Sequence, residues 1–367
     1  MVDSPLIQKT PLYEEHLALK AKMVAFGDWK MPVSYEGVLL EHKTVREHVG
    51  IFDVSHMGEV RVKGADATRF LQWLTINDVH KLSDGGGQYS AILNPDGGMI
   101  DDLIIYRLHS DEYFICVNAS NTKKDFDWIK TQSKNFSVDV VNESARWAQV
   151  AVQGPNSLAL VQRLVPGIES LPYTNIRDVT LFGKKSYIAR TGYTGEWGYE
   201  IYVPNESAKL LWLSLLETSG ELGTKPIGLG ARDTLRLESC YLLYGNDMND
   251  QVSPLEAGIQ WATKLDKGDF IGRSALIEQK QKGVSKKIVA FKMTEDGIPR
   301  HDMPIKKDGA VIGQVTSGSV LPTLGGAGGM AMVPTTLKEG DLFLVDIRGS
   351  LKPAIITKRP LYSAKVK

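Results

Sequence analysis

Alternating runs of apolar and polar residues divide the first 280 residues into strands and helices. The run 99–108 is rich in Ile, Leu and Tyr, which indicates a strand, and the turn-forming residues 94–98 precede it. Apolar residues at 67, 70, 71 and 74 have the spacing of an amphipathic helix. A unit of two strands and a helix occurs twice: 99–108, 113–118 and a helix to about 131, then 186–190, 199–203 and a helix to 217. Hairpins followed by helices favour antiparallel or mixed sheets with flanking helices, so we predict an α+β fold.

The two ends of the chain show different patterns. Helices are predicted over 13–23 and 38–47 near the N-terminus. A lysine-rich stretch, 279–287, reads as a linker. After it come short β-type runs separated by Gly, Pro and Asp, which are typical of a small barrel or sandwich: 288–293, 309–318, 342–345 and 354–357. We therefore divide the chain into a region 1–280 and a C-terminal β domain 283–363.

Composition excludes several functional classes. Lys plus Arg and Asp plus Glu both number 43, so the formal net charge is zero and no global charge favours nucleic acid. No apolar run reaches the ~18 residues of a membrane span, and residues 1–8 lack the pattern of a secretory signal. Cys116 and Cys240 lie in apolar runs, as buried thiols in a reducing compartment do, and the histidines lack metal-ligand spacing. These features predict a cytoplasmic protein without a metal.

Two adjacent carboxylates, Asp101 and Asp102, lie early in the predicted strand 99–108. Neighbouring residues on a strand point to opposite faces, so one of the two should face the interior or a cleft. An inward carboxylate without a partner is unfavourable or stays protonated. The pattern alone leaves two interpretations open: a pair that caps the start of a hairpin, or a functional site.

Five short motifs occur in order along the chain. They span residues 53–58, 97–103, 190–200, 230–238 and 244–247, and a further pattern lies at 313–318. Each motif alone is weakly specific, since Gly-Tyr-Thr-Gly is also an ordinary hairpin turn. Together, over about residues 10–362, they resemble the T-protein family, the aminomethyltransferases of the glycine cleavage system.

The resemblance implies a folate enzyme. Members of this family transfer the aminomethyl group on the lipoyl arm of the H-protein, a transient partner, to the co-substrate tetrahydrofolate. The products are 5,10-methylenetetrahydrofolate, ammonia and the reduced carrier. The family fold implied here is a three-lobed cloverleaf around a central folate channel, in which the last lobe is a small β-barrel.

The resemblance assigns the main catalytic role to Asp102. A carboxylate beside folate N5 and N10 would orient the attacking amine, stabilise developing positive charge and relay protons to the departing ammonia. Whether Asp102 carries the proton or acts only through its charge stays open. Asp101 is then its structural partner on the opposite strand face.

Two further residues match the family's pterin contacts. The carboxylate of Glu200 would accept the ring N–H and exocyclic amine of a pterin together, and Glu196 is its nearby competitor. Arg232 would hold a ring oxygen or carboxylate with its planar fork. From the residues alone, Glu200 could instead be a solvent-exposed strand residue, and Arg232 could pair with Asp233 or Glu238.

The remaining implied contacts are mostly aromatic or apolar. Met57, Tyr89 and Tyr193 would form walls and stacking faces for the pterin and benzoyl rings. Asn118 would bond the pterin edge, although its position also suits a helix N-cap. Tyr362 is the last implied substrate contact.

Two alternatives belong to related families. A folate-dependent demethylase module of the dimethylglycine or sarcosine type usually accompanies a flavin-binding oxidase, whose dinucleotide fingerprint this chain lacks. A folate-binding iron–sulfur assembly factor, which transfers no aminomethyl group, carries a Lys-Gly-Cys-Tyr-type signature, whereas Cys240 lies in Glu-Ser-Cys-Tyr-Leu. The glycine-rich segment 324–329 is a departure from the usual family pattern and leaves that local loop in doubt.

Overall fold

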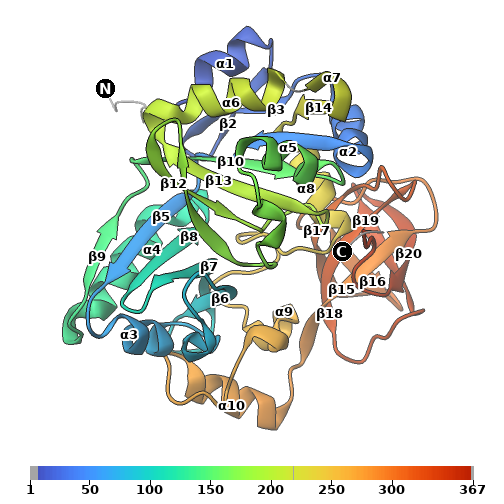
Figure 1. Ribbon diagram of the computed structural model, residues 1–367. Helices are drawn as coiled ribbons and strands as arrows, with labels where there is room; N and C mark the ends of the chain where they lie inside the picture. The colour runs from blue at the N-terminus through green and yellow to red at the C-terminus, as the bar shows by residue number, and fades with distance from the viewer. Residues whose placement is uncertain (1–6, 218, 365–367) are drawn as a thin grey trace, which may run out of the picture.

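Three lobes surround the middle of the molecule in this computed structural model, which describes residues 7–217 and 219–364 (Figure 1). Two lobes are built on sheets with flanking helices, and the third, orange to red in the figure, is a barrel. The α+β class and the C-terminal barrel are thereby confirmed. Most of the stretch used to judge targeting, residues 1–8, lies outside the described residues.

A five-stranded antiparallel sheet of order β6-β7-β8-β5-β9 forms the first lobe. Its strands are β5 (Gly58–Lys63), β6 (Gly87–Leu93), β7 (Met99–His109), β8 (Glu112–Val117) and β9 (Asp139–Asn142). Two helices, α3 (Ala67–Leu74) and α4 (Thr122–Gln132), pack on it. The predicted amphipathic stripe is confirmed, since Phe70, Leu71 and Leu74 of α3 are buried in the core of this lobe.

A six-stranded mixed sheet of order β11-β12-β13-β10-β4-β14 forms the second lobe. Its strands are β4 (Val49–Asp53), β10 (Trp147–Gln153), β11 (Ile176–Leu181), β12 (Lys184–Ala189), β13 (Gly198–Pro204) and β14 (Thr224–Pro226). The helices of this part of the chain are α2 (Val38–Glu47), α5 (Ser157–Leu164), α6 (Ala208–Glu217), α7 (Ser219–Leu222) and α8 (Leu229–Glu238). Among the described strand pairs of this sheet, β14–β4 is parallel and the other four are antiparallel.

An aromatic cluster joins the two sheets. Phe114 of β8 stacks on Tyr187 of β12 at 5.5 Å and meets Tyr202 of β13 edge-on at 5.2 Å. Tyr106 of β7 and Trp147 of β10 belong to the same buried cluster. Because large aromatic faces bury much area and prefer defined angles, this contact fixes β7 relative to the second lobe.

The first predicted helix is shorter than 13–23. Helix α1 (Tyr13–Ala18) ends before Lys20, whose φ of 55° lies in the left-handed region. The backbone N–H of Ala21 then bonds the carbonyl of His16, a helix-ending contact. The chain continues as β2 (Lys22–Phe26), which pairs with β3 (Trp29–Ser34), and β1 (Gln8–Lys9) completes a small sheet.

Interpreting residues 279–287 as a linker was wrong. Helix α10 (Arg273–Lys282) covers the first part, and only residues 283–285 separate it from the barrel. Leu276 is the helix's single buried residue, so no apolar stripe distinguishes it from a loop. A short helix, α9 (Pro254–Ala257), precedes α10 and carries a capping box formed by Ser253 and Glu256.

A closed six-stranded barrel of order β15-β18-β17-β16-β19-β20 makes the third lobe. Its strands are β15 (Lys286–Met293), β16 (Pro304–Lys307), β17 (Ala310–Val320), β18 (Ala327–Pro334), β19 (Leu342–Ile347) and β20 (Ser350–Thr357). The glycine-rich segment 324–329 runs into β18, a strand that the sequence pattern did not predict. A Cβ at Gly329 would stand 1.9 Å from the Ser317 carbonyl oxygen, so glycine permits close backbone approach there.

The tail after β20 returns to the loops around α8. Guanidinium nitrogens of Arg359 donate to the carbonyls of Ala257 at 3.2 Å and Cys240 at 3.4 Å. The backbone N–H of Tyr362 donates to the Glu238 carbonyl at 2.8 Å. Within residues 7–217 and 219–364, no helix combines the length and apolarity needed to cross a membrane.

Candidate active site

Asp101 and Asp102 lie beside an irregularity near the start of β7. Ile92 pairs with Asp101 and Leu93 with Met99, so Ile100 is an extra residue in the β6–β7 ladder. Asp101 has no exposed surface, whereas Asp102 is partly exposed. The expectation that one carboxylate of the pair faces the interior is confirmed.

The side chain of Asn118 binds both carboxylates. Its Nδ2 donates to Asp101 Oδ1 at 2.9 Å and to Asp102 Oδ1 at 2.8 Å, and its backbone N–H donates to Asp101 Oδ2 at 3.3 Å. Asn118 does occupy the N-cap position of the short turn 119–121, but its side chain forms no capping hydrogen bond there. One amide therefore sets the relative position of the two aspartates.

Besides Asn118, Tyr89 also binds Asp102: its hydroxyl donates to Asp102 Oδ2 at 2.9 Å. Burial raises the pKa of Asp102 to about 7, the charge of Asp101 adds to this, and the bonds from Tyr89 and Asn118 oppose it. A carboxyl with a pKa near the working pH can both accept and return a proton. The local structure thus suits Asp102 to proton transfer at neutral pH.

Aromatic side chains flank Asp102. Tyr89 stacks on Trp261 with ring centroids 5.4 Å apart, and Trp261 is 63% exposed. Tyr193 stacks on Tyr241 at 5.8 Å, and its hydroxyl donates to the Leu242 carbonyl at 2.5 Å. Nothing in the sequence distinguished Trp261, since a tryptophan in the short 3-10 helix 260–262 gives no sign of which ring it will cover.

Arg232 of α8 lies over the face of Tyr193, with its guanidinium carbon 4.8 Å from the ring centre. The ion pairs considered for it do not form, because Asp233 pairs with Arg236 at 2.7 Å and Glu238 with Arg46 at 3.1 Å. Among the described residues Arg232 has no ion pair at all. Burial lowers its pKa, and the nearby charge of Glu200 opposes that effect.

Glu200 and Glu196 differ in how their carboxylates are engaged. Glu200 of β13 is 9% exposed and accepts a 2.5 Å hydrogen bond from the Thr191 hydroxyl, and burial raises its pKa. Glu196 instead accepts from Arg46 Nη1 at 2.8 Å and from the Tyr362 hydroxyl at 2.7 Å. Its charge is therefore already balanced by the protein.

The predicted residues fall into two groups in space. Met57 is half-buried against the apolar cluster that includes Ala231 of α8, next to Arg232. Hydrogen bonds, ring contacts or mutual electrostatic effects connect Tyr89, Asp102, Asn118, Tyr193, Arg232 and Glu200. Within the described residues, Tyr362 has no hydrogen bond or ring contact with these six; its ring lies 3.9 Å from the guanidinium carbon of Arg46, and its hydroxyl donates to Glu196. Its role as a substrate contact stays a prediction.

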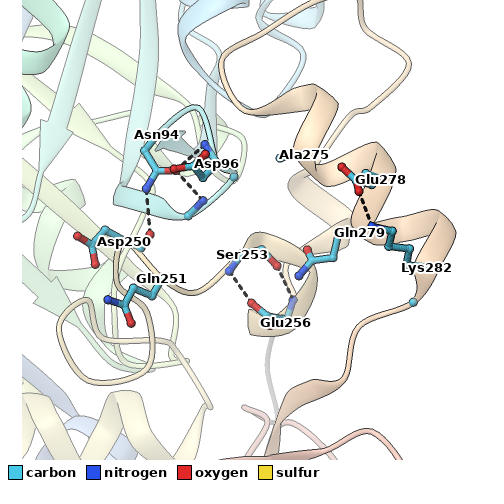
Figure 2. Close-up of a pocket in the computed structure, with 13 residues that line it drawn as sticks. Asn94, Asp96, Asp250, Gln251, Ser253, Glu256, Ala275, Glu278, Gln279 and Lys282 are labelled. Carbon is cyan, nitrogen blue, oxygen red and sulfur yellow. Dashed lines mark hydrogen bonds and ion pairs between the residues drawn. The ribbon is translucent and has the colours of Figure 1, made fainter.

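A surface pocket of about 570 Å³ lies beside the turn that precedes β7 (Figure 2). Asn94 in its wall donates to the Asp250 carbonyl at 2.9 Å and accepts from the N–H of Gly98 at 3.0 Å. A Cβ at Gly98 would stand 1.7 Å from the Asp250 carbonyl oxygen, so this turn requires glycine. None of the predicted site residues lines this pocket, so it is separate from the Asp102 cluster. In the described part of the chain, no group of three or more His, Cys, Asp and Glu side chains is arranged to hold a metal ion.

Comparison with known proteins decides the family. The model described as GCVT N-terminal domain matches residues 12–267, and the glycine cleavage T-protein C-terminal barrel domain matches residues 286–363. The chain belongs to the glycine cleavage T-protein family. A protein named Aminomethyltransferase from Halothermothrix orenii is 48% identical over 328 residues, covering 89% of this chain and 92% of the relative. Another of that name from Desulfitobacterium hafniense is 44% identical over 358 residues, covering 97% and 98%.

A solved structure agrees with the family at the level of the whole fold. The glycine cleavage system aminomethyltransferase T of Bartonella henselae is 33% identical, with a TM-score of 0.92, and the match covers 98% of this chain and 99% of that one. The family is one of transferases, so this chain is a transferase. Neither the demethylase module nor the iron–sulfur assembly factor is favoured by these matches.

Proposed function

We propose that the chain transfers the aminomethyl group carried on the lipoyl arm of an H-protein to tetrahydrofolate, releasing ammonia. The observation that carries the proposal is the cluster of Asp102, Asn118 and Tyr89, in which a carboxyl with a pKa of about 7 is held by two hydrogen bonds. Tetrahydrofolate would supply the two amines that take up the one-carbon unit. Asp102 would orient the attacking amine, balance its developing positive charge and pass a proton toward the leaving ammonia.

The second group of contacts fits a flat, polar heterocycle. Arg232 has no ion pair among the described residues, and Glu200 is a buried carboxylate near it. Tyr89, Tyr193 and Met57 offer ring faces and an apolar wall. A pterin combines a donor pair with an acceptor oxygen on a planar ring, which matches a carboxylate, a guanidinium and aromatic faces. We assign folate binding to these residues and propose the central channel as its place.

Glu200→Gln should weaken tetrahydrofolate binding by roughly 1–3 kcal/mol, because an amide cannot accept two donors as a carboxylate does. Isothermal titration calorimetry of the purified protein measures this directly. Glu196→Gln is the matched control, since Glu196 bonds Arg46 and Tyr362 instead. Unchanged affinity in Glu200→Gln together with a loss in Glu196→Gln would transfer the pterin contact to Glu196.

The H-protein should dock through charge and only transiently. Carriers of this kind tend to be acidic, and a chain of zero net charge can meet one through a local basic surface. We expect the KM for H-protein to rise several-fold as ionic strength increases from about 0.01 M to 0.15 M, over which the Debye length falls from about 30 Å to 8 Å. The kcat should stay nearly constant, because the bound complex is less screened. A KM that does not change with salt would contradict electrostatic docking.

The proposal also covers compartment and domain limits. Cys116 and Cys240 are buried free thiols, which suits the reducing cytoplasm. We place the main folate-binding region at 1–280 and the barrel domain at 283–363.

The test of the activity mixes the chain with tetrahydrofolate and aminomethylated H-protein and measures ammonia. Folate binding without ammonia release would instead support a non-enzymatic folate protein.

A further inference from the structure

Asp125 is a buried acid whose carboxyl group has no hydrogen-bond donor beside it. It lies on α4 and has no exposed surface, and neither of its carboxyl oxygens receives a hydrogen bond from any described residue. Its helix neighbour Asp127 is 55% exposed and pairs with Lys123. An ionised carboxylate that accepts no hydrogen bonds is strongly disfavoured in an apolar interior, so burial favours the protonated form of Asp125.

No described residue donates to the Asp125 carboxyl, and the side-chain hydrogen bond that contributes to its raised pKa is to another acid, Asp101. Two facing carboxyls with no donor between them cannot both be ionised and instead share one proton. Asp101 already accepts two hydrogen bonds from Asn118 and is therefore the acceptor of the pair, whereas Asp125 accepts none. The proton therefore resides on Asp125, which donates it to Asp101.

The other charged groups facing Asp125 do not change this assignment. Asp102 on β7 adds repulsion, and Lys124 on α4 is the only cation among the groups acting on Asp125. The ammonium group of Lys124 instead donates hydrogen bonds to the Ile100 carbonyl at 2.6 Å and to the Tyr244 hydroxyl at 3.1 Å. Burial is the largest influence and, with the hydrogen bond to Asp101, raises the pKa of Asp125 to about 11.

We propose that Asp125 is a positioning residue: a permanently protonated acid that donates a hydrogen bond to Asp101 and so fixes the Asp101–Asn118–Asp102 arrangement. The inference rests on the proposed function of Asp102. The hydrogen bond from Asp125 holds the Asp101 carboxyl toward Asn118, and Asn118 in turn holds Asp102. The charge kept on Asp101 also helps to keep the proton affinity of Asp102 high.

The first test compares Asp125→Asn, Asp125→Ala and the exposed control Asp127→Asn. An amide also donates to Asp101, so Asp125→Asn should keep kcat and the acid limb of its pH profile within about threefold and about 0.3 pH unit of the parent. Asp125→Ala removes the donor and should lower kcat by about tenfold to a hundredfold, with the KM for folate nearly unchanged. Asn118 would then hold Asp102 less firmly, and because the hydrogen bond from Asn118 lowers the pKa of Asp102, the acid limb should move to higher pH. The proposal is overturned if Asp125→Asn behaves like Asp125→Ala, or if Asp125→Ala behaves like the parent.

The second test needs no transfer activity. At about pH 9, where ~99% of a carboxyl with a pKa of 7 is ionised, infrared spectra should still show a protonated carboxylic acid. Burial also raises the pKa of Glu59, but any acid band from Glu59 is common to the parent and the variants and cancels in the subtraction. Subtracting Asp125→Asn from the parent should reveal one further acid band, and subtracting Asp127→Asn should reveal none. If the Asp125→Asn spectrum keeps every acid band of the parent, the inference is overturned, even if the protein transfers the aminomethyl group. If the band is lost in Asp125→Asn but the parent protein shows no transfer activity, the inference stands and the proposed function fails.

Discussion

Asp102→Asn should lower kcat by about 10²–10⁴-fold, the range of general acid–base catalysis, while the Kd for tetrahydrofolate changes by no more than about threefold. The amide keeps the size of the side chain but can neither carry the charge nor exchange the proton. Ammonia release gives kcat, and calorimetry gives Kd. The contrast between the two separates a catalytic role from a binding role.

The pH profile supplies a second readout for Asp102. Because its pKa is raised to about 7, its ionised fraction and the kcat of the parent should rise as pH increases through about 7. Asp102→Asn should lack this limb. Asp96→Asn, an equally small change at an exposed position in the preceding turn, is the control and should leave it intact. A large loss in Asp101→Asn beside near-normal Asp102→Asn would reverse the roles of the two aspartates.

Glu238→Ala should destabilise the protein by about 3–5 kcal/mol, the usual cost of removing one partner of a buried ion pair. The Glu238 side chain has no exposed surface and contacts Arg46 at 3.1 Å and His42 at 3.2 Å. Its other oxygen accepts from the backbone N–H of Thr323, in the loop between β17 and β18, at 2.8 Å. The substitution therefore removes the acceptor that Arg46 and His42 share and frees the barrel's loop. Urea unfolding followed by fluorescence measures the change.

The matched control is Glu47→Ala on α2, beside Arg46. Glu47 is 52% exposed and 3.8 Å from Lys43, so its loss should cost no more than about 0.5 kcal/mol. Burial favours a higher pKa for Glu238, but the bonds from His42 and Thr323 hold its pKa below the usual value. Its stabilisation is thus complete above about pH 4.3, the unfolded value, and is lost as pH falls below that. Equal losses for the two variants would contradict the buried network.

Sequence patterns predicted the elements that have a strong periodicity. Helix α3 follows its apolar spacing, and strand β7 follows its run of Ile, Leu and Tyr. Patterns failed where tertiary packing overrides composition. Helix α10 buries only Leu276, and β18 contains glycines because neighbouring backbones approach too closely for a side chain.

The candidate site shows the same division. The motif containing Asp102 was visible in the sequence, but its partners depend on folding. Asn118 reaches both aspartates from the end of a different strand. Asp125 becomes notable only once its burial without a donor is known, and in the sequence it is one acid in a charged helix. Such contacts join residues whose spacing along the chain carries no period, so no pattern could reveal them.

The returning C-terminal tail limits how the barrel can move. The barrel is joined covalently through residues 283–285, and a second attachment follows β20, where Arg359 binds the carbonyls of Ala257 and Cys240 and Tyr362 binds that of Glu238. The barrel is also attached through Thr323, which bonds Glu238, and through Ser317, which bonds Arg236. Any movement of the barrel away from α8 must therefore break these contacts as well as those of the tail.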